Sequence, residues 1–305
     1  MLAALAIDAA FGWPAPLFAR IGHPVTWIGK LISRLDGHFN RGGPISRRVA
    51  GIGTALLVIG LSAAAGWAIQ SRLPGGLDGI VLTGVLAWPL VAARSLLEHV
   101  AAVAAPLGRG DLAAARQAVA LIVGRDPERL DAAGIARAAL ESLAENASDG
   151  VIAPLFWGAA LGLPGIAAYK AINTLDSMIG HRTPRHEAFG WASARIDDLA
   201  NLLPARLTGL LLALVSARPK AALACMARDA GHHRSPNAGW PEAALAGALG
   251  LRLSGPRVYA SRIADEPWVN AAGADPDAPA MRRALALYVR GVLAWAALSL
   301  AAAVL

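Results

Sequence analysis

The feature that most constrains the fold is a series of apolar windows, each close to the length that a helix needs to cross a bilayer. The hydrocarbon layer is about 30 Å thick and takes about 20 helical residues to cross. The windows 51–70 and 77–97 are uninterrupted, whereas the windows 151–168, 202–217 and 291–305 are shorter or broken by prolines, an arginine or the chain end. We therefore expect an all-α, polytopic integral membrane protein with four or five membrane helices, some of them broken or re-entrant, plus cytoplasmic helices and loops.

Composition agrees with a membrane location. Hydrophobic residues make up 56% of the 305 residues and charged residues only 16%, against about 25% charged in soluble domains. The net charge of +7 comes from basic residues scattered between apolar segments, which favours cytoplasmic loops over a nucleic-acid interface. The single cysteine, Cys225, forms no internal disulfide and is expected to be buried. The N-terminus has no basic region before its apolar residues, so we expect it to be retained and buried rather than cleaved.

The distribution of basic residues predicts the membrane topology. They are dense before residue 51 and again over 109–137, so the positive-inside rule places both segments in the cytoplasm. A complete crossing by 151–168 would separate the charged residues before and after it. The prolines and glycines of this segment favour a broken or re-entrant helix beside a polar cavity that opens to the cytoplasm: Pro154, Gly158, Gly162, Pro164 and Gly165.

No internal repeat or domain boundary is visible, so we expect one catalytic domain over 1–305 with a loop-rich cytoplasmic elaboration at about 218–290. The segment 110–146 predicts two amphipathic helices. Asp111 would cap the first, and the turn 125–127 would precede the second.

Three charged runs lie among these apolar segments: ESLAENASDG over 141–150, YKAINTLDSMIGHR over 169–182 and ARIDDLANLLPAR over 194–206. Ionisable groups near a bilayer cost several kcal/mol each unless they face a partner, a cavity or water. These runs are therefore where we expect the functional site.

The first run predicts a metal site. Residues three or four apart share one side of a helix, so Glu141 and Glu145 would line up with Ser148 or Asp149. Converging carboxylates repel unless a cation lies between them, and Mg²⁺ prefers such oxygen ligands. The alternative is a solvated acidic face, or carboxylates paired with Arg137 and Arg125.

The second run offers Lys170, Asn173, Thr174 and Ser177 at helical spacing, with Asp176 one position off. Lys170 could bind a phosphate as a point charge, and Asn173 could orient a ligand amide or phosphate.

The third run predicts an acid and amide face formed by Asp197 or Asp198 with Asn201. Arg195 and Arg206 flank this face. The alternative is internal salt bridging, for example between Arg195 and Asp198, that neutralises charge near the membrane.

The histidines are less informative. No pair has the spacing of a helix-borne zinc site, and only His23 and His233 are kept as weak candidates. The sequence contains no G-x-x-x-x-G-K-[ST] run, no G-x-G-x-x-G run and no nucleophile elbow. A nucleotide would have to bind without the usual phosphate loops.

Six strings resemble the adenosylcobinamide-phosphate synthase family, also called the cobinamide synthases, of cobalamin biosynthesis. They are long and unusual, and their order fits from His23 to about Tyr259. The strings are IGHPVTWIG, VGRDP, ESLAENASDGVIAPLFW, YKAINTLDSMIGHR, FGWASARIDDLANLLPARLTG and SPNAGWPEAALAGALG.

The resemblance implies a multi-pass enzyme of the inner membrane whose site faces the cytoplasm. It would amidate the free propionate carboxylate of adenosylcobyric acid with (R)-1-amino-2-propanol or its O-phosphate, giving adenosylcobinamide or its phosphate. The reaction would use ATP and Mg²⁺. The expected partners are the corrinoid, the amine, the lipid bilayer, and further copies of this chain or other membrane enzymes of the pathway. Nucleic acid is not among them.

A carboxylate must be activated before an amine attacks it, most simply as an acyl phosphate, and that transfer needs cations around charge-dense oxygens. On this basis we assign catalytic roles to Glu141, Glu145, Lys170 and Asp198. Substrate binding is assigned to His23, Asn146, Asn173, Arg195, Asn201, Arg206, Ser235 and Asn237. Magnesium ligation is assigned to Glu141, Glu145, Asp149, Asp176 and Asp197.

Two other functions are weighed against this one. A membrane prenyltransferase would bind a diphosphate through Mg²⁺ with two Asp-rich clusters, but only Asp197 and Asp198 resemble such a cluster. A non-enzymatic transporter would use buried charges as a translocation path. The abundance of polar residues in loops and the lack of inverted halves argue against it.

Overall fold

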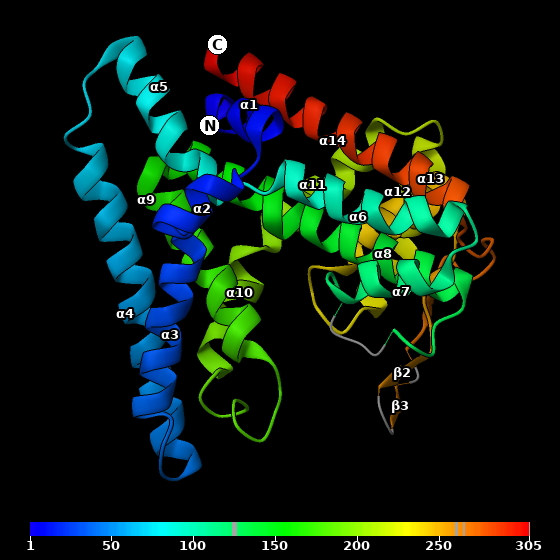
Figure 1. Cartoon of the computed structure of the whole chain (residues 1–305), viewed down its shortest axis with the longest axis horizontal. Helices are drawn as coiled ribbons and strands as arrows, with labels where there is room; N and C mark the ends of the chain where they lie inside the picture. Colours follow the sequence, from blue (N-terminus) through cyan, green and yellow to red (C-terminus); the bar gives the residue numbers. More distant parts are fainter. Residues whose placement is uncertain (124–126, 260–261, 265, 305) are drawn as a thin grey trace. The chain divides into compact units, whose positions relative to one another are not determined.

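The computed structural model describes residues 1–123, 127–259, 262–264 and 266–304, and most of them are helical (Figure 1). Within these residues the strands are only two or three residues long. The all-α prediction is therefore confirmed. Residues 125 and 126 of the predicted turn at 125–127 lie outside the described residues.

The described residues form two compact units, each built from two stretches of chain. The first unit comprises Met1–Ala92 and Ala153–Asn201, and the second comprises Ala93–Ile152 and Leu202–Leu305. The prediction that the whole chain works as one catalytic domain stays a prediction.

The first unit contains α1 (Leu2–Phe11), α2 (Ala15–Ile21), α3 (Pro24–Phe39), α4 (Pro44–Gln70), α5 (Gly76–Ala87), η1 (Trp88–Leu90), α9 (Ala153–Leu175), the π-helical turn η3 (Asp176–Gly180) and α10 (Trp191–Ala200). The second contains α6 (Ala93–Gly108), α7 (Leu112–Ala120), α8 (Ala132–Asn146), the π-helical turn η2 (Ala147–Ile152), α11 (Leu202–Leu214), α12 (Pro219–Asp229), η4 (Ala230–His232), α13 (Gly239–Leu249) and α14 (Ala278–Val304). Its strands are β1 (Leu253–Ser254), β2 (Arg257–Tyr259), β3 (Arg262–Ala264) and β4 (Trp268–Val269).

Among the described residues, four helical segments are long and apolar enough to cross a membrane: Pro44–Gln70, Gly76–Gly108, Ala132–Gly180 and Ala278–Ala303. A fifth crossing is available if Leu2–Phe11 and Ala15–Phe39, which meet at a bend of 109°, act together. The prediction of four or five membrane helices is confirmed, and the chain is a multi-pass membrane protein. The window 202–217 is shorter than a full crossing, since α11 has only 13 residues, or about 20 Å of helix.

The N-terminal helices were not predicted as a crossing. The break at Gly12, Trp13 and Pro14 divides an apolar stretch that would otherwise be long enough. The prediction of a buried N-terminus holds for one side of α1 only, because Asp8 is buried while Phe11 is 67% exposed.

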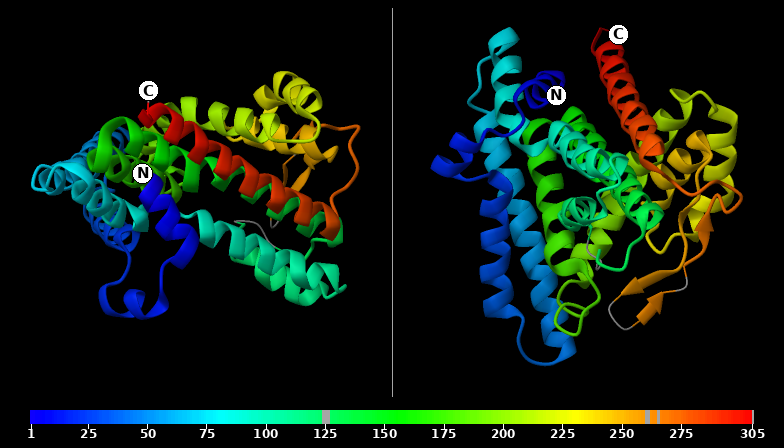
Figure 2. Two further views of the ribbon diagram at one scale, coloured as in Figure 1. Left: turned by 90° about the horizontal axis from the view of Figure 1, so that it is seen from above. Right: turned by 45° about the vertical axis from the view of Figure 1, so that its right-hand side comes forward.

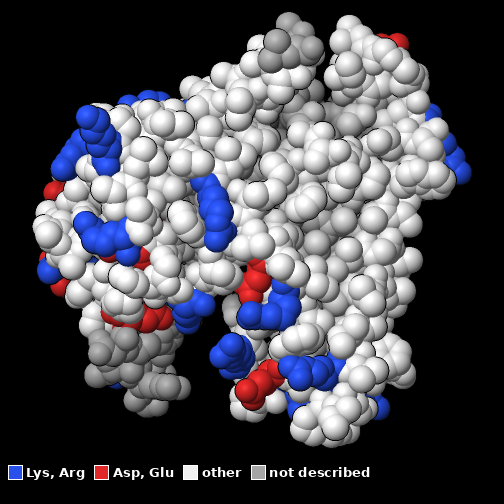
Figure 3. Space-filling model, turned by 180° about the vertical axis from the view of Figure 1, so that it is seen from behind, with Lys and Arg blue, Asp and Glu red and all other residues white. Residues whose placement is uncertain are grey.

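Helix α4 packs closely against α9 and against the segment before α10 because glycines of α4 face the neighbouring backbone. A Cβ atom at Gly66 would lie 2.7 Å from the Leu163 carbonyl oxygen of α9, and one at Gly51 would overlap the carbonyl oxygen of Phe189, just before α10. Small residues allow this close approach between membrane helices. The outward side of α4 carries the exposed apolar side chains Leu56, Leu57, Leu61 and Trp67, and Figure 3 shows broad areas without charged side chains.

Helix α9 is broken as its prolines and glycines predicted. Gly162 has φ 71° and ψ −151°, which no helix contains, and Pro164 follows it. The Leu163 N–H released by the break donates to Gln70 Oε1 at 2.6 Å, so the last side chain of α4 replaces the lost helical acceptor. Whether this segment re-enters the side from which it came stays a prediction.

The second unit is built around α8. Figure 2 shows α6 and α14 as neighbouring long helices of this unit. Asp111 caps α7 by accepting from the Ala114 N–H at 3.0 Å, as predicted. The prediction that α8 is amphipathic is wrong, because nearly every residue from Gly134 to Ala144 is buried. Its small residues let several elements pack around it.

The predicted loop-rich region at about 218–290 contains two helices, α12 and α13, and the start of α14. Two short antiparallel pairings complete it, β1 with β4 and β2 with β3. The first pairing places Ser254 opposite Trp268.

Candidate functional site

The acidic run of α8 does not form one continuous carboxylate face. Glu141 is only 8% exposed, whereas Glu145 and Asn146 are exposed and Asp149 is half-buried. Asp149 lies in the π-helical turn Ala147–Ile152, whose wider winding changes the register that an α-helix would give. Such turns are rare in proteins, and those that occur are often found at functional sites. Here the turn interrupts the side on which we expected three carboxylates.

Glu141 is tied to the β1–β4 pairing. Its Oε1 accepts a hydrogen bond from the Ser254 N–H at 2.9 Å. Ser254 has φ 59°, a left-handed conformation that costs a residue with a side chain about 1 kcal/mol or more. The carboxylate of Glu141 therefore helps to hold a strained backbone position.

Trp268 anchors this pairing between two arginines. The guanidinium carbons of Arg137 and Arg252 lie 4.7 Å and 4.9 Å from its ring. Both arginines also bind Asp275, with Arg252 Nε 2.7 Å from Oδ1. Hydrogen bonding from Arg252, with the charge of Arg137 adding to it, lowers the pKa of the Asp275 carboxyl. Arg137, one of the two arginines considered as partners of the acidic run, thus pairs with Asp275, and the other, Arg125, lies outside the described residues.

The loop before α13 is organised by its own side chains. His233 Nδ1 accepts from the Ser235 N–H at 3.0 Å. Ser235 Oγ in turn accepts from the N–H groups of Asn237 at 3.2 Å and Ala238 at 3.3 Å. The Ser235 hydroxyl, predicted to bind substrate, is thus used to shape the turn that starts α13.

Arg206 and Asn237, both predicted to bind substrate, lie together in this unit. Arg206 Nη1 is 2.8 Å from the Leu202 carbonyl oxygen and 3.4 Å from Asn237 Oδ1. Its guanidinium carbon lies 4.6 Å from the ring of Trp240. These contacts fix Arg206 against the start of α13.

Glu242 is a candidate residue that sequence reasoning missed. It lies on α13 and is 3% exposed, with Oε2 3.8 Å from His233 Nε2. Because His233 Nδ1 accepts a hydrogen bond, the neutral ring carries its proton on Nε2, toward Glu242. One signal was available, since Glu242 is the only charged residue of the apolar string WPEAALAGALG.

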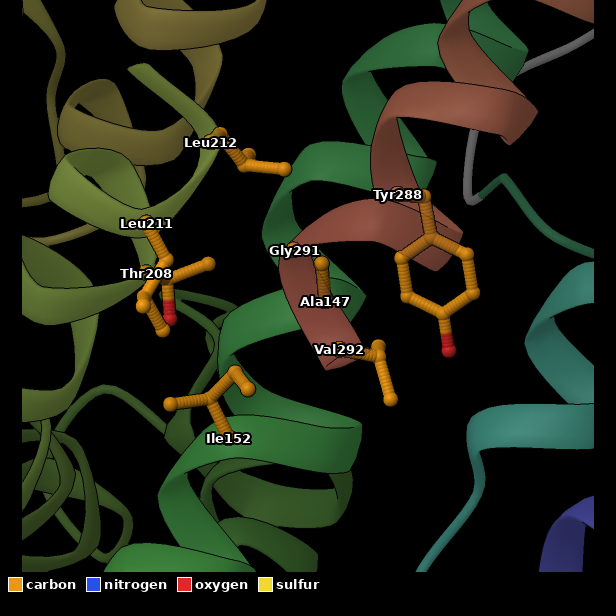
Figure 4. A pocket seen from close by; sticks show the side chains of 8 residues that line it. All are labelled: Ala147, Ile152, Thr208, Leu211, Leu212, Tyr288, Gly291 and Val292. Carbon is orange, nitrogen blue, oxygen red and sulfur yellow. The ribbon is translucent and has the colours of Figure 1, made fainter. Parts of the chain in front are cut away.

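The described residues of this unit line two cavities of different size. One holds about 170 Å³ and is lined by His232, His233, Arg234, Ser254, Glu266, Pro267 and Val269. The other, shown in Figure 4, holds about 10 Å³ among largely apolar side chains of η2, α11 and α14. Its Thr208 and Tyr288 hydroxyls donate to the carbonyl oxygens of Pro204 and Ala93. Of these two cavities of the described residues, the larger has the size and polarity of a ligand site.

In the first unit, Lys170 lies on α9 and is 8% exposed. The Thr174 hydroxyl donates to the Lys170 carbonyl oxygen at 2.6 Å, and the Ser177 hydroxyl donates to that of Asn173 at 2.8 Å. Both hydroxyls thus bond back to the preceding helical turn. Lys170 is buried and Asn173 is half-buried, and their predicted roles in ligand binding stay predictions.

A buried hydrogen-bonded chain joins α9 to the end of α10. The Tyr169 hydroxyl donates to Asn201 Oδ1 at 2.8 Å, and Asn201 Nδ2 donates to Asp197 Oδ2 at 3.0 Å. Tyr169 and Asn201 are each 1% exposed. The predicted acid and amide pairing is present, but it joins two helices of the protein, and Tyr169 was not predicted.

Arg195 and Asp198 form the internal ion pair that we considered as an alternative, with Nη2 2.9 Å from Oδ2. Burial raises the pKa of the Asp198 carboxyl, while the charges of Arg195 and Arg182 oppose that rise. Asp176 is half-buried in the second π-helical turn.

His23 caps α3. Its Nδ1 accepts from the Val25 N–H at 3.2 Å, and Thr26 Oγ1 accepts from the His23 N–H at 3.2 Å. The ring also meets Trp13 edge-on, with centroids 4.9 Å apart. The observed contacts of His23 are structural, so nothing here supports its predicted role in substrate binding.

Metal ligation needs several donors close together. In the part of the chain that the structure describes, no three His, Cys, Asp or Glu side chains gather closely enough to hold a metal ion. The five predicted magnesium ligands therefore do not form a protein-only cage there. Mg²⁺ is commonly held by one or two carboxylates together with substrate phosphates, so the metal roles stay predictions.

Fold and site together define a polytopic helical membrane protein that keeps carboxylates, a lysine and an amide network buried in its charged runs. The model of the family described as CobD/Cbib protein matches residues 1–288. The chain belongs to this family, which confirms the resemblance seen in the sequence.

Curated relatives agree. The chain is 63% identical over 292 residues to the cobalamin biosynthesis protein CobD of Rhodobacter capsulatus, covering 96% of this chain and 93% of the relative. It is 50% identical over 280 residues to the protein of the same name from Sinorhizobium sp, covering 88% and 86%. Brucella suis has a relative 50% identical over 282 residues, covering 88% and 85%. No solved structure matches. The chain has a role in cobalamin biosynthesis.

Proposed function

We propose that the chain is an ATP- and Mg²⁺-dependent ligase that amidates the free propionate carboxylate of adenosylcobyric acid. The amine would be (R)-1-amino-2-propanol or its O-phosphate, and the product adenosylcobinamide or its phosphate. The observation that carries the proposal is membership of the CobD/Cbib family over residues 1–288, which sets the pathway. The buried Glu141, Lys170 and Glu242 supply the kinds of groups that amide formation needs.

Amide formation from a carboxylate requires a leaving group. In the proposed reaction, a carboxylate oxygen attacks the γ-phosphorus of ATP, ADP leaves, and the resulting acyl phosphate is attacked by the neutral amine with release of phosphate. Each step develops negative charge that nearby cations stabilise. Mg²⁺ would arrive with ATP and neutralise charge on the phosphates.

Roles for individual side chains follow from their surroundings. We propose that Lys170 and Arg195 in the first unit contact phosphate oxygens, with Asn173 orienting the ligand. In the second unit, Glu141 and Glu242 are proposed to act near the amine, where a carboxylate can take up its proton. The Arg206 guanidinium already bonds Leu202 and stacks on Trp240, so its proposed role is to position the loop with Ser235 and Asn237.

The inner membrane is the proposed location, with the charged runs facing the cytoplasm because ATP is found there. The dense basic residues of the segments before 51 and over 109–137 support this orientation.

The test is product formation by the purified protein. Adenosylcobyric acid, Mg-ATP and aminopropanol O-phosphate should yield a corrinoid heavier by the amine less one water, with one phosphate released for each product. Lys170→Ala should be impaired, while Lys220→Ala, at an exposed lysine of α12, serves as the matched control. The proposal is wrong if the wild-type protein alters no corrinoid with any primary amino alcohol or its phosphate.

A further inference from the structure

The larger cavity of the second unit has the size of a small ligand. It holds about 170 Å³, well below the roughly 300–1,000 Å³ of sites for drug-sized molecules. A corrinoid or a nucleotide is therefore too large to be enclosed. A polar molecule with a short carbon chain fits this volume.

The cavity carries opposite charges side by side. Arg234 Nη1 lies 3.9 Å from Glu266 Oε1, and the two side chains are 69% and 16% exposed. Arg234 is therefore on the solvent side, while the Glu266 carboxylate is more enclosed. A ligand with an anionic end and a cationic end can satisfy both groups at once, the anion at the guanidinium and the cation at the carboxylate.

The enclosed side of the cavity adds further polar groups. His233 lines the cavity and lies 3.8 Å from buried Glu242. Ser254 also lines it, and its N–H is held by Glu141. The cavity therefore borders Glu141, the first residue of the acidic run, through one hydrogen bond.

We infer that this cavity binds a small aminoalkyl phosphate, with the ammonium at Glu266 and the phosphate at Arg234. The cavity and its charges support this ligand class independently of the reaction. Its identification as the amine substrate, aminopropanol O-phosphate, rests on the proposed function.

Binding to the full-length protein in detergent, measured by calorimetry without ATP or corrinoid, tests the inference. The probes are (R)-1-amino-2-propanol O-phosphate, (R)-1-amino-2-propanol and inorganic phosphate. Arg234→Ala should weaken binding of the phosphorylated amine about tenfold, because one charge-assisted contact is lost, and should leave binding of the plain amine unchanged. Glu266→Gln should weaken both amines.

Two further variants keep the test sharp. Arg234→Lys retains the charge and should restore most of the affinity, which a purely structural defect would not allow. Arg109→Ala, at an exposed arginine of the same unit, should bind every probe as the wild type does.

The inference is overturned if the wild-type protein binds no phosphorylated amine, or if Arg234→Ala and Glu266→Gln bind it unchanged. The corrinoid product assay separates this outcome from the fate of the proposed function. If both variants form product normally with an unchanged KM for the amine, the inferred ligand site is wrong and the proposed ligase activity stands. If the wild-type protein binds the phosphorylated amine but makes no product, and both variants lose binding, the ligand site is supported and the ligase activity is wrong.

Discussion

The two units use buried polar groups in different ways. In the first, the polar side chains bond other parts of the helical framework, as in the chain from Tyr169 through Asn201 to Asp197 and in the bond from Leu163 to Gln70. In the second, two buried carboxylates meet a strand and a loop that line a cavity, Glu141 at Ser254 and Glu242 at His233.

The contrast between the units shows that a charged residue near a membrane does not by itself indicate catalysis. A polar group that joins two helices lowers the cost of its own burial and fixes their packing. A polar group beside a cavity is available to a ligand as well. Substitutions in the first unit should therefore lower stability first, and substitutions in the second should lower binding or turnover first.

Lys170 is the proposed exception in the first unit and gives the largest expected effect. If it contacts phosphate in the transition state, Lys170→Ala should lower turnover roughly 10²- to 10³-fold with little change in the unfolding midpoint. Corrinoid product measured by mass spectrometry, with thermal unfolding in the same detergent, tests this. A large drop in midpoint together with normal turnover would make Lys170 another structural group.

Glu141 tests the second unit. Glu141→Gln keeps an oxygen that accepts the Ser254 N–H but removes the charge, so we expect turnover to fall at least about tenfold while the unfolding midpoint stays close to the wild type. Glu141→Leu, which removes the acceptor as well, should lower both. Equal turnover in the wild type and Glu141→Gln would show that the carboxylate serves structure alone.

Gly51 tests how much the close packing of α4 contributes to the stability of the first unit. A Cβ at this position would overlap the Phe189 carbonyl oxygen, whereas one at Gly53 on the same helix meets nothing within 4 Å. Gly51→Ala should therefore destabilise by about 1–3 kcal/mol. Gly53→Ala should be neutral or slightly stabilising, because alanine favours helix. Similar unfolding midpoints for the two variants would contradict the close packing of α4.

Tyr169 should have a smaller effect of the same kind. Tyr169→Phe removes the hydroxyl that bonds Asn201 and should cost about 1 kcal/mol, with turnover largely retained once the protein is folded. Chemical denaturation combined with the product assay measures both. A variant that unfolds like the wild type but loses turnover would show that this hydrogen-bonded network serves catalysis and not only stability.

Cys225 gives the smallest expected effect. It is 2% exposed, and burial, followed by the charge of Asp229, raises the pKa of its thiol to about 12. The thiol therefore stays protonated at pH 8 and should resist alkylation. Iodoacetamide should modify Cys225 in the unfolded protein and leave it unmodified in the native one, as read by peptide mass. Rapid labelling of the native protein at pH 8 would show that α12 opens readily.

The sequence alone determined the features that depend on neighbouring residues. Hydropathy is a sum over a local window, so the crossings within Pro44–Gln70 and Gly76–Gly108 were predictable from the windows 51–70 and 77–97. The Asp111 cap acts three residues away on Ala114 and was readable for the same reason. The break at Gly162 was expected because glycine and proline act on their own backbone.

Which polar groups meet depends on how distant parts of the chain pack together. Gln70 and Leu163 lie 93 residues apart in sequence, and Glu141 and Ser254 lie 113 apart. The residues around one partner do not identify the other, because the packing of the helices brings the two partners together. The same is true of α8, which looked amphipathic and is buried nearly all round because other elements surround it. Local sequence therefore fixed where the charges are, and packing determined whether each one joins helices or lines a cavity.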